Sequence, residues 1–304
     1  MPASLRTVAV LSALTVAVVR SASQSPPLLV FTAGSLARPM RAALDTFAAR
    51  NHIEVQQENS GSLEAARKLT DLQRVPDVIA LADQAVFTKL LVPRYVSGYT
   101  QFAHNRMVLA FTDKSKFATE ISAANWYAVL QRPGVETGRA DPSLDPNGYR
   151  TLLVIRLAEQ WYQQPALAGR LLDASPVRNV RPNENDVLAL LQAGEFDYAW
   201  SYESMAEAAG VRFLRLPPEI DLSDPSQAAR YATVSVKVAG STRGDSVNFR
   251  GEPIVYGIAI PSGAPHRELA VRFVAWLTSR DGIRVLRAAK LDALEQPRYV
   301  AGAP

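Results

Sequence analysis

The sequence contains no cysteine in its 304 residues. This absence excludes disulfide bonds, thiolate metal sites, cysteine nucleophiles and a lipid anchor on a processed N-terminal cysteine. Histidine is scarce as well. His52, His104 and His266 stand in none of the spacings that hold zinc, such as His-x-x-x-His or His-Glu-x-x-His. We therefore expect no resident metal and no thiol chemistry.

An excess of charge of one sign is also missing. The chain has 33 Lys and Arg against 29 Asp and Glu, a net charge of +4, and no run of five or six like charges. Nucleic acid is therefore not an expected partner. The 48% hydrophobic and 20% charged residues are typical of a globular protein. At roughly 150 residues per domain, the length predicts two domains.

The N-terminal segment differs from the rest of the chain. Residues 1–23 place Arg6 before an apolar run and end in Ser21-Ala22-Ser23, which is the pattern of a signal peptide. No later apolar stretch reaches the roughly 18 residues of a membrane span. We expect an exported, periplasmic protein without a lipid anchor, and removal of Arg6 and Arg20 leaves it nearly neutral.

Short apolar runs alternate with helical patterns, which predicts an α/β fold. The expected strands are Leu28–Ala33, Ile53–Asn59, Asp77–Ala82, Met107–Thr112, Asp197–Tyr202, Val211–Leu216, Thr233–Val238 and Ile254–Ile260. Helical stripes are formed by Leu36, Met40, Leu44 and Phe47, by Leu63, Ala66, Leu69 and Leu72, by Leu153, Leu157 and Trp161, and by Leu269, Phe273, Val274 and Leu277.

Two segments are expected to cross between lobes, Phe102–Thr112 and Glu252–Pro261. They divide the chain after the signal peptide into a discontinuous lobe 1, residues 24–104 plus 258–304, and lobe 2, residues 105–257. The polar stretch Ala239–Gly251 is expected to be a surface loop or an irregular connection.

Four places share one design, in which a strand ends, a small or capping residue follows and a helix starts. They are Ala33-Gly34-Ser35, Ser60-Gly61-Ser62, Leu144–Gly148 and Trp200–Ser204. Each helix start offers free backbone N–H groups, and the serines add hydroxyl donors. If the four converge, they form a cage that binds a fully ionised oxyanion. The simpler alternative is that Ser35, Ser62 and Asp145 are only helix N-caps.

A larger set of motifs carries a family resemblance. The order and spacing of Thr32–Leu36, Asn59–Ser62, Phe102–Arg106, Asp145–Arg150, Leu157–Glu159, Asp197–Ser204 and Leu216–Leu222 resemble the molybdate/tungstate-binding proteins of ABC transporters, in particular their tungstate-binding branch. The resemblance runs from about Leu28 to Phe273.

The resemblance implies a two-lobed periplasmic-binding-protein fold of type II, with the ligand in a cleft between the lobes. It also implies delivery of the oxyanion to an ABC permease. By the same resemblance, Ser35 and Ser62 hydrogen-bond the oxyanion, and Asp145 can approach the metal itself.

One departure concerns the carboxylates. The branch usually has Glu before the Tyr of the fourth turn, where this chain has Ser201 before Tyr202. With Asp145 as the remaining carboxylate, we expect a four-coordinate oxyanion held by donors. The expected ligand-binding residues are Gly34, Ser35, Gly61, Ser62, Asp145, Asn147, Ser201 and Tyr202. Arg150 and Arg181 are the basic residues nearest these turns, with solvated salt bridges as their default role.

The sequence thus predicts a monomeric, non-enzymatic binding protein for molybdate or tungstate, with no cofactor. Sulfate and phosphate stay open as ligands, and phosphate would need an acceptor such as Asp145. A Ser-dependent hydrolase or transferase is the alternative from another class. It is disfavoured because the chain has no Gly-x-Ser-x-Gly motif and because Ser35 and Ser62 would each need a distant His as a base.

Overall fold

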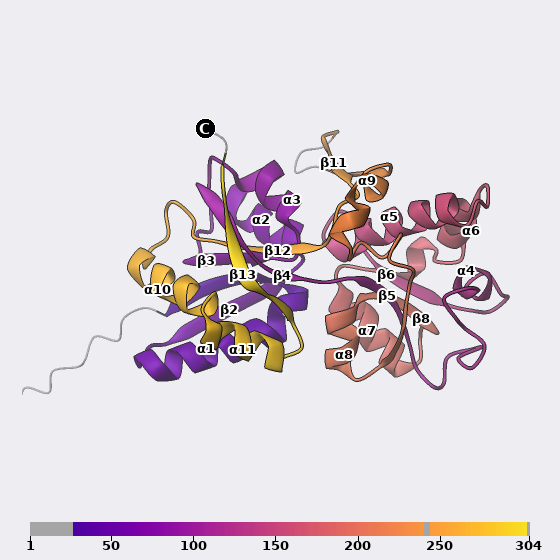
Figure 1. The fold of residues 1–304 in the computed structure, drawn as a ribbon, viewed down its shortest axis with the longest axis horizontal. Helices are drawn as coiled ribbons and strands as arrows, with labels where there is room; N and C mark the ends of the chain where they lie inside the picture. Colours follow the sequence, from indigo (N-terminus) through magenta and orange to yellow (C-terminus); the bar gives the residue numbers. More distant parts are fainter. Residues whose placement is uncertain (1–26, 240–243, 303–304) are drawn as a thin grey trace, which may run out of the picture.

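The computed structural model describes residues 27–239 and 244–302, so the predicted signal peptide lies outside the described residues. Two lobes lie side by side along the long axis, and each has a β-sheet with helices packed around it (Figure 1). The predicted α/β architecture with two lobes is therefore confirmed. No helix among the described residues is long and apolar enough to cross a membrane.

Lobe 1 is built on a six-stranded sheet of order β13-β4-β12-β3-β1-β2. Strands β1, β2 and β3 are parallel to one another. Strand β12 pairs antiparallel with β3 and β4, and β13 pairs antiparallel with β4. The bounds are β1 (Leu28–Ala33), β2 (Val55–Ser60), β3 (Val78–Leu81), β4 (Gly98–His104), β12 (Val255–Ala259) and β13 (Asp292–Ala301). Because helices cover both faces of its centre, β3 and β12 are buried along their whole length.

The helices of lobe 1 follow the predicted stripes. Leu36 and Met40 are buried, as are Leu44 and Phe47. The bounds are η1 (Gly34–Leu36), α1 (Ala37–Asn51), α2 (Ser62–Thr70), α3 (Gln84–Val86), the π-helical turn η2 (Phe87–Leu91), α10 (Arg267–Leu277) and α11 (Arg280–Ala288). Leu72 was predicted on the stripe of α2 but lies beyond its end and is 65% exposed.

Lobe 2 is built on a five-stranded sheet of order β7-β6-β8-β5-β9. Its strands are β5 (Met107–Phe111), β6 (Thr137–Ala140), β7 (Val180–Arg181), β8 (Tyr198–Tyr202) and β9 (Arg212–Arg215). Around it lie α4 (Trp126–Val129), α5 (Pro146–Trp161), α6 (Leu167–Asp173), η3 (Val177–Asn179), α7 (Glu184–Ala193), α8 (Glu203–Ala209), η4 (Pro225–Gln227) and α9 (Ala228–Tyr231).

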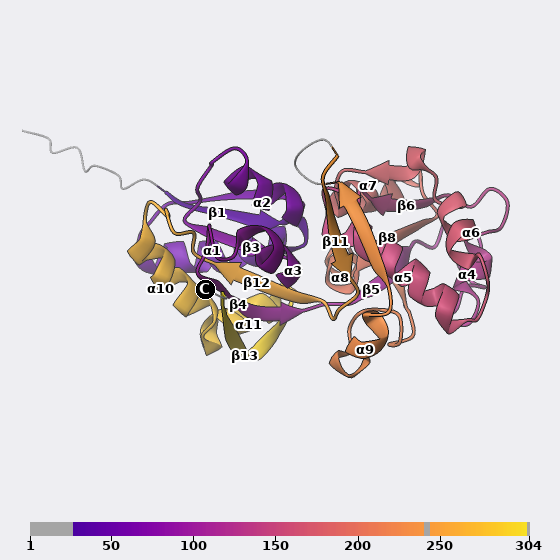
Figure 2. The same ribbon diagram turned by 90° about the horizontal axis from the view of Figure 1, so that it is seen from above.

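A two-stranded antiparallel hairpin, β10 (Ser235–Ala239) and β11 (Ser246–Arg250), is attached to lobe 2. It lies next to the boundary between the lobes (Figure 2). The prediction of a surface loop or irregular connection over Ala239–Gly251 was wrong for Ala239 and for residues 246–250, which form the paired strands. Residues 240–243 lie outside the described residues. Val236, Val238 and Phe249 are buried, and this packing holds the polar sequence in a strand.

The sheets are joined at two points. Asn105-Arg106 connects β4 to β5, and residues 251–254 lead from β11 into β12. Strand β12 pairs with β4 from its first residue, Val255, and with β3 from Gly257, whereas the predicted boundary of lobe 1 is residue 258. The division into two moving lobes stays a prediction.

Candidate functional site

The first two of the four predicted turns lie in lobe 1. Ser35 belongs to η1 and Ser62 is the first residue of α2, and both are almost completely buried. The N-cap positions are occupied by Ala33 and Gly61, and neither helix start has a side-chain cap. The alternative that Ser35 and Ser62 are only helix N-caps is therefore wrong.

Both serine hydroxyls already accept a hydrogen bond. Ser62 Oγ accepts from the backbone N–H of Ala82 at 3.0 Å, and Ser35 Oγ accepts from the hydroxyl of Tyr256 at 3.0 Å. Each serine keeps its own hydrogen for donation to another acceptor.

The third turn starts α5 in lobe 2, and here the cap alternative is correct. The Asp145 carboxylate caps the helix by accepting from the backbone N–H of Asn147 at 2.9 Å, and it also accepts from that of Glu184 at 3.1 Å. Burial raises the pKa of Asp145 to about 6, against the lowering effect of these two bonds.

Asn147 is the clearest sign of a ligand. Its side chain is 0% exposed, and both its amide nitrogen and its amide oxygen have no hydrogen-bond partner among the described residues. Leaving a buried polar group unpaired costs about 1–3 kcal/mol, so such a group calls for an explanation. A polar ligand at the start of α5 would supply the partner.

The fourth turn reveals a carboxylate that the sequence analysis missed. Glu184, the first residue of α7, accepts on Oε1 from Ser201 Oγ and from the backbone N–H of Tyr202, both at 2.6 Å. The premise that Asp145 is the only carboxylate at the site is therefore wrong. The available signal was an acidic residue directly after Asn183, the N-cap of a helix.

The surroundings set the charge of Glu184. Burial and the neighbouring Asp145 raise the pKa of Glu184 well above its usual range, so the neutral acid is favoured. The Ser201 hydroxyl donates to this carboxyl group. Its predicted role as a donor to the oxyanion would require that bond to break.

Arg150 is part of the site rather than a solvated surface residue. It is 2% exposed and donates to the backbone oxygen of Ala82 at 2.8 Å and to the hydroxyl of Tyr202 at 2.7 Å. Its second nitrogen lies 3.2 Å from Asp83 Oδ2. Arg150 thereby links α5 of lobe 2 to the end of β3 in lobe 1. Arg181 donates to the backbone oxygens of Arg178 and Val180, away from these contacts.

The two glycines show how closely the lobes approach. A Cβ on Gly61 would lie 2.1 Å from the backbone oxygen of Leu144, and one on Gly34 would lie 2.8 Å from Asn185 Nδ2. The turns of lobe 1 thus touch the third turn and the start of α7 in lobe 2. Together with the hydrogen bonds of Asp145, Glu184 and Arg150, these contacts bring the predicted turns into one cluster.

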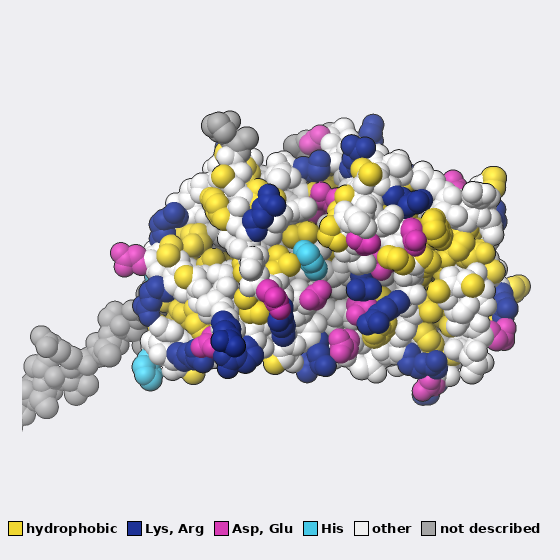
Figure 3. All heavy atoms as spheres, viewed as in Figure 1, with side chains coloured by type: hydrophobic (Ala, Val, Ile, Leu, Met, Phe, Trp, Pro, Cys, Tyr) yellow, Lys and Arg dark blue, Asp and Glu magenta, His cyan; other side chains and the backbone are white. Residues whose placement is uncertain are grey.

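Metal ligands and surface charge were also considered in the sequence. Among residues 27–239 and 244–302, no cluster of three His, Asp or Glu side chains could hold a metal ion. Acidic and basic side chains are interspersed over the face seen in Figure 3, as expected for a chain of small net charge.

Comparison with known proteins places these observations in a wider group. The family model described as bacterial extracellular solute-binding protein matches residues 28–289. An uncharacterized solute-binding protein of Petrotoga mobilis is 39% identical, over 90% of this chain and 85% of its own length. The molybdate/tungstate-binding protein WtpA of Thermococcus kodakarensis is 36% identical, over 91% of this chain and 85% of its own.

Solved structures agree on the fold. The periplasmic molybdate-binding protein of Azotobacter vinelandii superposes with a TM-score of 0.62 at 16% identity, covering 87% of this chain and 98% of its own. The sulfate-binding protein SubI of Mycobacterium tuberculosis also superposes with a TM-score of 0.62, at 13% identity, covering 89% of this chain and 88% of its own. The two-lobed periplasmic-binding fold predicted from the sequence is confirmed.

Proposed function

This chain belongs to the bacterial extracellular solute-binding proteins, and we propose that its solute is molybdate or tungstate. The observation that carries the proposal is the fully buried Asn147 amide at the start of α5, which has no hydrogen-bond partner among the described residues. The names of the relatives from Thermococcus kodakarensis and Pyrococcus abyssi, which are 36% and 35% identical, support the choice of oxyanion.

The donor set favours an anion that carries no proton. Ser35, Ser62 and Tyr202 each already accept one hydrogen bond and keep a hydrogen to donate. Arg150, which donates to the Tyr202 hydroxyl and pairs with Asp83, adds a buried positive charge. A tetrahedral dianion presents oxygen acceptors in every direction, and oriented donors stabilise it without the cost of moving a proton.

The ligand-binding residues of this proposal are those of the predicted turns: Gly34, Ser35, Gly61, Ser62, Asp145, Asn147 and Tyr202, with Ser201 acting through Glu184. The proposal includes no catalytic step and no cofactor. Ser35 contacts Tyr256 and Ser62 contacts the backbone of Ala82, and neither partner is a base that would activate a hydroxyl.

We also propose that the protein works in the periplasm as a monomer after removal of residues 1–23, and that an ABC permease receives its ligand. The extracellular family supports export, and the small interspersed charge of the surface agrees with a soluble carrier.

Elemental analysis tests the choice of solute. The protein is incubated with a mixture of molybdate, tungstate, sulfate and phosphate, freed of unbound ions by gel filtration, and analysed for Mo, W, S and P. We expect about one atom of Mo plus W per chain. Retention of phosphorus, or of sulfur above the methionine content, without Mo or W would replace the proposed ligand by phosphate or sulfate.

A further inference from the structure

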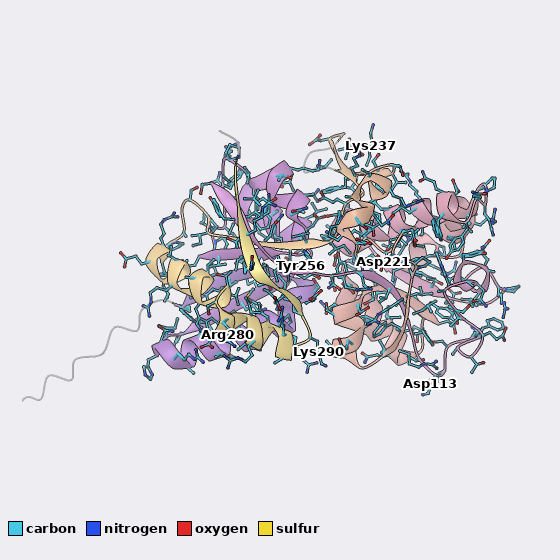
Figure 4. The ribbon with its side chains drawn as sticks, in the orientation of Figure 1. Asp113, Asp221, Lys237, Tyr256, Arg280 and Lys290 are labelled. Atoms are coloured by element: carbon cyan, nitrogen blue, oxygen red, sulfur yellow. The ribbon has the colours of Figure 1, made fainter. Side chains whose placement is uncertain are left out.

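The hydroxyl of Ser35 lies at the end of a chain of hydrogen bonds that starts where the lobes are joined. Tyr256 on β12 donates to Ser35 Oγ, and the amide nitrogen of Asn105, in the link between β4 and β5, donates to the Tyr256 oxygen at 2.8 Å. Tyr256 lies close to the junction of the lobes in Figure 4. Tyr256 is 0% exposed and Asn105 is 7% exposed.

Backbone groups orient this series of hydrogen bonds at its Asn105 end. The backbone N–H of Arg106 donates to Asn105 Oδ1 at 2.9 Å, and that of Ser204 approaches the same oxygen at 3.5 Å. A backbone N–H can only donate, so the Asn105 oxygen must face these groups. Its amide nitrogen must then face Tyr256, whose oxygen accepts.

The same reasoning continues to the site. Because the Tyr256 oxygen accepts from Asn105, its own hydrogen points to Ser35, and Ser35 Oγ accepts it. Burial raises the pKa of the Tyr256 phenol, so this hydrogen is retained. The hydrogen of Ser35 is left to point away from Tyr256.

We propose that Tyr256, held by Asn105, is a positioning residue that turns the Ser35 hydrogen toward the ligand and thereby favours oxyanions without a proton. The inference rests on the proposed function, because it takes the oxyanion as the acceptor of the Ser35 hydrogen. A hydrogen phosphate ion must donate its own proton, and Ser35 receives it less well when one of its two acceptor positions is taken by Tyr256 and its hydrogen already points at the ligand. Molybdate and tungstate need donors only.

A double-mutant cycle tests whether Tyr256 acts through Ser35. Affinities for molybdate are measured by calorimetry for the wild type, Tyr256→Phe, Ser35→Ala and the double variant. We expect Tyr256→Phe to weaken binding about tenfold, the typical effect of disturbing one hydrogen bond to a charged group. In the Ser35→Ala background the same substitution should change affinity less than about twofold, because nothing remains to be oriented.

Tyr198→Phe is the matched control. Tyr198 is also a buried tyrosine whose hydroxyl donates, but its acceptor is the backbone oxygen of Lys116. This substitution should leave affinity unchanged. The ratio of molybdate to phosphate affinity gives a second readout, which should fall in Tyr256→Phe and stay constant in Tyr198→Phe.

Asn105→Asp should reverse the direction of these hydrogen bonds with a side chain of the same shape as asparagine. An aspartate presents an acceptor to Tyr256, whose hydrogen then turns away from Ser35, and the Ser35 hydrogen is drawn to the phenol oxygen. Binding should weaken at least as much as in Tyr256→Phe. In the Tyr256→Phe background, Asn105→Asp should reduce the affinity for molybdate less, because only the added negative charge then affects binding.

The outcomes separate the two proposals. A wild type that binds molybdate or tungstate, with Tyr256→Phe binding equally well or with losses that simply add in the double variant, overturns the role of Tyr256 and leaves the proposed function intact. A wild type that binds only sulfate or phosphate overturns the proposed function. The cycle is then run with that anion, and coupling between Tyr256 and Ser35 still decides the role of Tyr256. A wild type that binds none of the four anions overturns both.

Discussion

The side chain of Ser62 offers a direct test of donation to the ligand. Ser62→Ala removes a buried hydroxyl that is not a helix cap, so we expect affinity for molybdate to fall more than tenfold, which corresponds to about 1.5–3 kcal/mol for a hydrogen bond to a charged group. Ser175→Ala is the control, because Ser175 is equally buried but donates to Thr137. Normal binding by Ser62→Ala would place the ligand elsewhere.

In the proposed site, Glu184 bears on how the metal of the oxyanion would be coordinated. Burial and the neighbouring Asp145 raise the pKa of Glu184 and so favour its neutral acid, which is a poor metal ligand. We therefore still expect four-coordination although a second carboxyl group is present. Glu184→Gln imitates the neutral acid and should leave affinity within about tenfold. X-ray absorption of the bound metal should show four oxygens. Two further, longer oxygen distances together with a far larger loss in Glu184→Gln would show that Glu184 binds the metal.

The raised pKa of Asp145 makes stability depend on pH. Its value of about 6 lies above the roughly 3.9 of an unfolded chain, so between these values the folded protein holds a proton that the unfolded chain has lost. The resulting stabilisation is complete below about pH 4 and is lost as pH rises through about 6. The free energy of unfolding, measured by denaturant titration without ligand, should vary with pH by about 2–3 kcal/mol less in Asp145→Asn than in the wild type. If the free energy of unfolding of Asp145→Asn depended on pH as in the wild type, the pKa of Asp145 would not be raised in the folded protein.

Single residues also show where sequence reasoning reached its limit. The turns around Ser35 and Ser62 were predictable because each follows a predicted strand and carries small residues in one short run, and the turn at Asp145 because an N-cap residue is followed by proline and glycine. Glu184 was not predictable as a site residue. It stands 17 positions before Ser201 and meets it only because α7 and β8 pack together. The role of Arg150 likewise depends on a contact between lobes.

Among the helices and turns, the loop before α5 and the start of α2 make a close contact between the lobes. Gly61 has ordinary extended dihedral angles (φ −60°, ψ 147°), so an alanine is allowed by the backbone and only its contact with Leu144 opposes it. Gly61→Ala should weaken ligand binding at least tenfold. The free energy of unfolding without ligand should change by less than about 1 kcal/mol if the two lobes move apart without ligand, as predicted, because the overlap is then avoided.

Gly34→Ala provides the comparison, measured in the same calorimetric titrations. A Cβ at Gly34 would meet the end of the Asn185 side chain, which can rotate. The loss of ligand affinity should therefore be smaller than in Gly61→Ala. Equal affinity of Gly61→Ala and wild type would show that the ligand-bound form does not bring these turns together.

The elements differ in how well the sequence predicted them. Buried strands such as β1, β5 and β8 are continuous apolar runs, and they were found within one or two residues. Strands β4, β6, β7, β11 and β13 were missed. Strands β6 and β7 are only four and two residues long. Strands β11 and β13 have mostly exposed or half-buried residues, and each pairs with one neighbour. Their sequences carry no alternation strong enough to distinguish them from loops.

The whole molecule is held in the observed arrangement by contacts spread along the boundary of the lobes. Besides Arg150 and Asp83, Lys290 of lobe 1 pairs with Glu207 of lobe 2 at 3.1 Å, and Arg38 donates to the backbone oxygen of Ala208 at 2.8 Å. Lys290 lies at the edge of lobe 1 that faces lobe 2 in Figure 4. A ligand that bridges the turns of both lobes stabilises this arrangement by mass action.

The central claim is that these turns bind a fully deprotonated oxyanion of molybdenum or tungsten. Calorimetric titration of the purified protein with molybdate, tungstate, sulfate and phosphate, each at neutral pH, measures this most directly. We predict saturable binding of molybdate and tungstate at one site per chain, at least a hundredfold tighter than sulfate or phosphate, a difference of about 2.7 kcal/mol. Tighter binding of sulfate or phosphate, or no binding of molybdate and tungstate, would contradict the account.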